Sequence, residues 1–175
     1  MSERAGRYQR SPGGMVGAVA VLVVLVLGYV GIRALISSPP DEERTVDYAR
    51  VVPDVRKAAG LAIVAPPSLP HGWRATSVRF TDDPPQHWHL GVLTNHDRYI
   101  GLEQGPQSVP AMISVYVDRS ASRRAPVRVG AQAWQTYTDS GGDLALVRRV
   151  GNTTTLVVGH EVPRATLTRY AASLR

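Results

Sequence analysis

The chain has 175 residues, of which 43% are hydrophobic and none is cysteine, and its formal net charge is +6. The absence of cysteine excludes a disulfide scaffold, a thiolate metal site, a cysteine nucleophile and a lipid-modified cysteine. The positive charge does not indicate a nucleic-acid surface, because residues 37–175 hold sixteen basic and thirteen acidic side chains and no basic stretch with interleaved aromatic residues.

The N-terminal part of the chain contains one long apolar run. Residues 1–14 are polar, include three arginines and are expected to form a cytoplasmic tail. Residues 15–32 follow without a charged side chain, and Ala34, Leu35 and Ile36 extend the run. An α-helix rises ~1.5 Å per residue, so a run of ~20 residues crosses the hydrocarbon core of a bilayer. Residues 15–36 are therefore predicted to form a transmembrane helix in the lipid bilayer.

The flanking charges predict the orientation of this helix. Three arginines precede it, whereas residues 41–43 are acidic. Positively charged flanks stay in the cytoplasm, so the N-terminus is expected inside and the C-terminal domain outside the cytoplasmic membrane. A cleaved signal peptide is the alternative. Its apolar region would run 7–15 residues and end at a small-residue site, so the longer run followed by Arg33 favours an uncleaved signal-anchor.

A linker and a helix are expected after the membrane. Residues 37–45 form the linker, which two prolines stiffen and acidic side chains solvate. Residues 46–59 carry a weak helical pattern and begin the extracytoplasmic domain, residues 46–175. The apolar positions that share one face of this helix are Val51, Val55 and Ala59.

From residue 73 the hydrophobic period becomes two, which is typical of strands. Residues 73–81 are predicted to form a strand, and residues 87–94 and 98–104 a hairpin. With a two-residue turn at positions 96 and 97, His89 faces Gln104, and Trp88 shares the other face with Glu103. A shift of the turn by one residue would exchange these neighbours.

The second half of the domain is also expected to contain helices, strands and a hairpin. Ser108 is expected to cap a helix, and residues 119–124 to form a basic loop. Predicted strands follow at 126–129 and 132–138, and the segments 144–150 and 153–158 form a hairpin around a type II′ turn at Gly151 and Asn152. Pro163 opens a last helix, whose apolar stripe is Leu167, Tyr170, Ala171 and Leu174.

These elements predict an α+β domain with an antiparallel sheet and helices packed mainly on one face. The order strand, hairpin, helix occurs twice, so a duplicated βββα unit is one interpretation. An ordinary α+β meander gives the same pattern and is the favoured interpretation.

Two histidines are candidates for chemistry. His87 and His89 lie two positions apart in a predicted strand, so both project from one face. A closed zinc site needs one or two further ligands, and His96 and Asp97 lie at the far end of the hairpin. No metal site and no cofactor are predicted. His89 is instead expected to hydrogen-bond Gln104, with His87 facing solvent.

Glu103 is the third candidate, because it lies in an otherwise apolar strand. Such a carboxylate can have a raised pKa and act as an acid or base. It has no second carboxylate at a suitable spacing, so an ion pair with an arginine on a neighbouring strand is expected and no catalytic residue is predicted. The G-x-S-x-G, Walker, H-E-x-x-H and G-x-G-x-x-G motifs do not occur.

An ordered series of short blocks resembles a known family. The blocks are V-x-A-P-x-x-L-P-x-G-W-R at 64–74, W-H-L-G at 88–91, Y-I-G-L-E-Q at 99–104, A-W-x-x-Y at 133–137 and A-A-S-L near the C-terminus. With the N-terminal anchor, they resemble the actinobacterial membrane-anchored proteins of domain of unknown function 4245. The resemblance covers about residues 15–175. It implies a single-span envelope protein with an extracytoplasmic α+β domain and no established activity.

The sequence favours a non-catalytic binding or scaffold module of the cell envelope, with an envelope protein as its partner and no nucleic acid. Two blocks of the resemblance form the predicted hairpin. The residues expected to bind a ligand there are Trp88, His89, Glu103 and Gln104. The alternatives are a small-molecule binder or weak hydrolase with its pocket around this hairpin, and a subunit of a larger membrane complex.

Overall fold

A computed structural model of the chain describes residues 45–175. The predicted tail and transmembrane helix, and the linker up to residue 44, lie outside the described residues. Within residues 45–175 every helix is too short or too polar to cross a bilayer.

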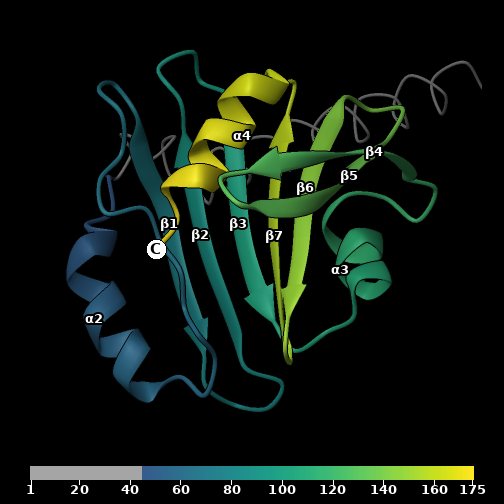
Figure 1. The fold of residues 1–175 in the computed structure, drawn as a ribbon. Helices are drawn as coiled ribbons and strands as arrows, with labels where there is room; N and C mark the ends of the chain where they lie inside the picture. The colour runs from purple at the N-terminus through teal and green to yellow at the C-terminus, as the bar shows by residue number, and fades with distance from the viewer. Residues whose placement is uncertain (1–44) are drawn as a thin grey trace, which may run out of the picture. The chain divides into compact units, whose positions relative to one another are not determined.

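Three helices and seven strands make up the described domain. In chain order they are α2 (Tyr48–Ala58), β1 (Arg74–Thr81), β2 (His87–Leu93), β3 (Tyr99–Gly105), α3 (Val109–Tyr116), β4 (Ser122–Val129), β5 (Gln132–Thr138), β6 (Asp143–Val150), β7 (Thr153–His160) and α4 (Arg164–Ser173). The strands form one sheet in the order β1-β2-β3-β7-β6-β5-β4 (Figure 1). Every neighbouring pair is antiparallel, so the predicted α+β class and antiparallel sheet are confirmed.

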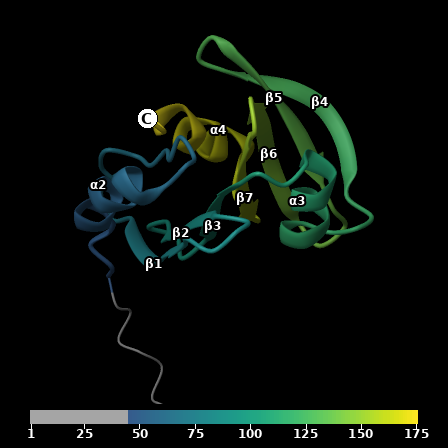
Figure 2. The ribbon, with the colours of Figure 1, turned by 90° about the horizontal axis from the view of Figure 1, so that it is seen from below.

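Helices cover both faces of the sheet. Helices α2 and α4 pack on one face, in a core that includes Leu146 of β6. Helix α3 packs on the other face, against Ala145 and Val147 of the same strand. In Figure 2, α4 and α3 lie on opposite sides of β7. Two of the three helices therefore share a face.

The strand order is symmetric about the β3–β7 pair, because β1-β2-β3 is mirrored by β5-β6-β7. A two-fold axis between β3 and β7 would place the helices that follow them on the same face. However, α3 and α4 lie on opposite faces. The strand order is therefore consistent with a duplicated βββα unit, but the positions of the helices are not.

The predicted register of the first hairpin is wrong by one residue. Thr94 N donates to Arg98 O at 3.0 Å, which leaves a three-residue loop. Its last residue, Asp97, has a φ of 53°, as in the common three-residue hairpin loop that ends in a left-handed residue. The longer loop moves the pairing by one position, so His89 lies opposite Glu103 and Trp88 opposite Gln104.

Two further expectations need correction. The buried face of α2 consists of Tyr48, Val52 and Val55, and Val51 is 36% exposed. The expected basic loop at 119–124 is partly a strand, because β4 begins at Ser122. As an edge strand, β4 pairs only with β5 and leaves its arginines in solvent, so the basic residues do not prevent pairing.

The turn and cap expectations of the second half are confirmed. Ser108 Oγ accepts a hydrogen bond from Ala111 N at the start of α3. Val150 pairs with Thr153 across a two-residue turn in which Gly151 has a φ of 55°. The residues of the α4 stripe that are buried are Leu167, Tyr170 and Ala171.

Candidate functional site

The sheet separates the four predicted ligand-binding residues into two pairs. The side chains of Trp88 and Gln104 face α2 and α4, and these residues are 0% and 1% exposed. His89 and Glu103 occupy the alternate positions of the same strands, so they project from the opposite face. One binding site cannot use all four side chains.

Gln104 has a structural role in the core. Its Oε1 accepts a hydrogen bond from Val64 N at 2.8 Å, and its Nε2 donates to Ala62 O and to Thr155 Oγ1. The amide thereby attaches the segment before β1 to the sheet. The expected hydrogen bond between His89 and Gln104 is absent, since the register turns these side chains to opposite faces.

His89 is instead the centre of a hydrogen-bonded row. Its Nδ1 lies 2.7 Å from Glu103 Oε1, and its Nε2 lies 2.8 Å from Ser77 Oγ. The direct pairing of His89 with Glu103 places the first contact. Ser77 pairs with Gly91, two residues further along β2, so it reaches His89 along the diagonal. We call Ser77, His89 and Glu103 the polar row.

Gly91 leaves the space in which the polar row forms. A Cβ atom at this position would lie 2.3 Å from Ser77 Oγ and 2.8 Å from the Tyr99 hydroxyl. A larger residue would therefore push Ser77 away from the imidazole of His89. Packing therefore explains why a glycine stands at this position of the W-H-L-G block.

The second oxygen of Glu103 faces His87. His87 Nε2 lies 3.1 Å from Glu103 Oε2 and 2.8 Å from the Tyr116 hydroxyl. The rings of His87 and Tyr116 stack with a centroid distance of 5.6 Å, so α3 holds this histidine in place. The expectation that His87 faces solvent is wrong, since its side chain is only 19% exposed.

The raised pKa that the sequence allows for Glu103 is not found, and the expected ion pair has other partners. Burial raises the pKa of this carboxyl. The hydrogen bonds and positive charge of His87 and His89 lower the pKa by more, so the net shift is downward. The partners are histidines and not the expected arginine. Burial and the negative charge of Glu103 in turn raise the pKa of Tyr99 and of Tyr116.

The polar row is not arranged as a metal centre. Each histidine nitrogen that faces Glu103 is directed at a carboxylate oxygen and not at a shared point. In the part of the chain that the structure describes, no three histidine, cysteine, aspartate or glutamate side chains are grouped to hold a metal ion.

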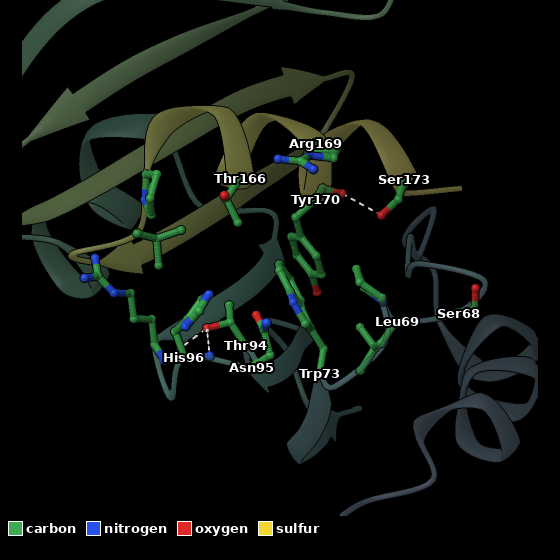
Figure 3. A pocket seen from close by; sticks show the side chains of 14 residues that line it. Ser68, Leu69, Trp73, Thr94, Asn95, His96, Thr166, Arg169, Tyr170 and Ser173 are labelled. Carbon is green, nitrogen blue, oxygen red and sulfur yellow. Dashed lines mark hydrogen bonds between the residues drawn. The ribbon is translucent and has the colours of Figure 1, made fainter.

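A cavity of about 790 Å³ opens at the turn of the first hairpin. Its walls come from three parts of the chain: the segment before β1, the β2–β3 turn and α4. The lining residues are Ser68, Leu69, Pro70, Trp73, Thr94, Asn95, His96, Arg98, Val162, Pro163, Thr166, Arg169, Tyr170 and Ser173. Figure 3 shows Tyr170 reaching from α4 toward Trp73 and Leu69, with the side chains of the turn beside them.

The inner wall of the cavity is aromatic and apolar. The rings of Trp73 and Tyr170 stack with centroids 6.1 Å apart and an interplanar angle of 26°. Burial raises the pKa of Tyr170, so its hydroxyl stays neutral. That hydroxyl is buried and has no hydrogen-bond partner among residues 45–175. We call Leu69, Trp73 and Tyr170 the apolar wall.

The rim of the cavity is basic. Arg98 and Arg169 line it together with His96, and the lining contains no acidic residue. Neither arginine forms an ion pair with another residue of the described domain. The nearest acidic side chain of the turn, Asp97, is bonded to Arg74 at 3.2 Å. The cavity therefore combines an apolar wall with positive charge that is available to an anion.

None of the residues proposed from the sequence lines this cavity. The sequence pattern predicts that Trp73 lies in a strand and that Tyr170 lies on a packing stripe, and aromatic residues at such positions usually belong to the core. Residues 64–74 did carry a signal, because the prolines and the tryptophan before β1 form the longest block of the resemblance. Their pairing with α4 is a long-range contact that periodicity does not reveal.

Comparison with known families identifies the chain. Residues 7–174 match the family described as "Protein of unknown function (DUF4245)". No curated protein matches the chain. The match spans almost the entire sequence, so the protein belongs to the DUF4245 family.

Proposed function

We propose that this DUF4245 protein is a single-pass protein of the cytoplasmic membrane and that its domain outside the membrane is a binding module, whose cavity at the β2–β3 turn binds a ligand without catalysis. The apolar run of residues 15–36 supports the anchor. The arginines before this run and the acidic residues after it support an inside N-terminus and an outside domain.

The ligand that best fits the cavity is a small amphipathic anion. A volume of about 790 Å³ lies within the range of small-molecule sites. The apolar wall suits an alkyl chain or a ring, and Arg98 and Arg169 suit a phosphate or carboxylate group. The observation that carries the proposal is the position of these two arginines, without acidic partners in the domain, at the rim of an aromatic cavity.

A titration with matched probes tests the ligand class. Residues 45–175 form a compact unit with their own hydrophobic clusters, so the domain can be produced alone. Decyl phosphate is expected to bind saturably, to raise the melting temperature and to change the fluorescence of Trp73. Decan-1-ol has the same chain without the charge and is expected to bind at least about tenfold more weakly, which corresponds to ~1.4 kcal/mol.

Variants of the rim separate the charge from the apolar wall. The double variant Arg98→Gln/Arg169→Gln is expected to bind decyl phosphate no better than the alcohol. Arg164→Gln is the control, because Arg164 lies on the same helix and does not line the cavity. Equal affinity of the native domain for the two probes, or a double variant with native affinity for the phosphate, would contradict the proposal.

The orientation is tested separately in intact cells. A reporter enzyme that is active only outside the cytoplasm, fused after Arg175, is expected to be active. The matched fusion at residue 12, before the apolar run, is expected to be inactive. The opposite pattern would rule out the proposed topology. An envelope protein partner is a separate proposal, which crosslinking in intact membranes would test.

A further inference from the structure

We propose a second, catalytic site on the opposite face of the sheet, in which Ser77 is a nucleophile that His89 activates and Glu103 orients, and whose substrates are small carboxylic esters. The proposal goes beyond the binding function and does not depend on the cavity. The residues that carry it are those of the polar row.

The contacts of the polar row follow the order that nucleophilic catalysis requires. A serine hydroxyl must contact one nitrogen of an imidazole, and a carboxylate must contact the other. Ser77 Oγ lies 2.8 Å from Nε2 of His89, and Glu103 Oε1 lies 2.7 Å from Nδ1. Both distances are those of direct hydrogen bonds, so the carboxylate fixes the tautomer that leaves Nε2 free to accept the serine proton.

The carboxylate itself is buried and fixed. The side chain of Glu103 is 5% exposed, and its second oxygen lies 3.1 Å from Nε2 of His87. Burial raises the pKa of Glu103, but the two histidines lower it by more, so the carboxyl stays ionised at neutral pH. A fixed negative charge at Nδ1 is what stabilises an imidazolium that forms at His89.

A substrate can reach the serine from solvent. Ser77 is half-buried and the His89 side chain is 18% exposed. Strand β1 is the edge of the sheet, and no other strand of the described residues covers its outer side. Ser77 lines none of the three described cavities, and a small carboxylic ester is the simplest substrate on which a serine nucleophile activated by a histidine can act.

The chemistry balances with water as the only co-reactant. Ser77 Oγ attacks the carbonyl carbon, and its proton passes to Nε2 of His89. The tetrahedral intermediate expels the alcohol, which takes that proton, and an acyl-serine remains. Water then attacks the acyl-serine with His89 again as base, which releases the carboxylic acid and restores the hydroxyl.

The first test is covalent labelling of the full-length protein in its membrane. A fluorophosphonate probe is expected to modify Ser77, as mapped by peptide mass spectrometry. His89→Ala is expected to slow the labelling at least about 100-fold, the usual size of a general-base contribution. Ser114→Ala is the control, because Ser114 is an exposed serine of α3, and it is expected to label normally. Unmodified Ser77 in the native protein, or labelling that persists in His89→Ala, would overturn the proposal.

A second test remains informative if some variants fold less well. The chain has no cysteine, so Ser77→Cys and Ser114→Cys each introduce a single thiol. At pH 7, iodoacetamide is expected to alkylate the folded Ser77→Cys variant at least about tenfold faster than the Ser114→Cys variant, because an adjacent imidazole favours the thiolate. Equal rates for the two variants would also overturn the proposal.

The role of Glu103 as a positioning residue has its own readout. In the Ser77→Cys background, Glu103→Gln is expected to shift the midpoint of the pH dependence of alkylation upward, because the amide no longer stabilises an imidazolium. A purely structural glutamate would leave this midpoint unchanged in the folded protein, and that result would remove Glu103 from the proposed site.

Discussion

The two faces of the β1–β3 half of the sheet use the same strands for different purposes. On one face Trp88, Leu90 and Leu102 are fully buried beneath α2 and α4. On the other face, the alternate residues of these strands form the polar row, and Tyr116 of α3 contacts His87 beside it. This hairpin is therefore both a core element and a candidate site, and its register decides which residue has which role.

The largest expected effect is on the apolar face. Trp88→Ala should lower the free energy of unfolding by about 3–5 kcal/mol, because it leaves a cavity in the core. Chemical denaturation measures this change. Trp88→Phe is the control, since it keeps an aromatic ring and removes an indole N–H that has no partner in the described domain. A loss below about 1 kcal/mol for the alanine variant would mean that this face is not the core.

The next effect comes from the spacer on the polar face. Gly91→Ala should cost about 1–3 kcal/mol through overpacking, because the new Cβ would meet Ser77 and Tyr99. Gly101→Ala is a close control in the neighbouring strand, where the nearest atoms would lie 3.4 Å away. Equal stability of the two variants would indicate that Gly91 does not hold open the space for Ser77.

Glu103 gives a smaller effect that depends on pH. Glu103→Gln should cost about 1–3 kcal/mol at neutral pH through the lost charged hydrogen bonds. The pKa of Glu103 is lowered in the folded state, so its stabilisation is present above the unfolded pKa near 4.5 and is lost as the pH falls below it. Denaturation from pH 7 to pH 3 checks this. A difference between native and variant protein that grows toward low pH would contradict the assignment.

The smallest effect on stability is expected at the cavity rim. The double variant Arg98→Gln/Arg169→Gln should leave the melting temperature almost unchanged, because these side chains are exposed and lack ion pairs within the domain. A clear loss of stability would show that the arginines support the fold, and the affinity changes proposed for them would then have a structural cause.

Local patterns predicted most of the fold correctly. The strand periodicity, the Ser108 cap, the turn at Gly151 and the α4 stripe depend on neighbouring residues, and each is present. The register of the first hairpin depends on one loop residue, Asp97, which adopts a left-handed conformation. A glycine at that position would have signalled the three-residue loop, but an aspartate did not.

The candidate sites were harder to predict than the fold. The unusual positions of His89 and Glu103 mark them in the sequence. Ser77 is an ordinary strand residue, and only the strand register shows that it contacts His89. The cavity joins Trp73, Arg98 and Tyr170, which lie far apart in the chain. No local signal connects such residues, and the apolar wall therefore had the pattern of ordinary core.

The register of β2 against β3 is the claim on which both faces depend. It can be measured directly by nuclear Overhauser effects between backbone protons in the isotope-labelled domain 45–175. The structure predicts cross-strand contacts that pair His89 with Glu103 and Gly91 with Gly101. Contacts that pair His89 with Gln104 would return Glu103 to the face of Trp88 and contradict the polar row.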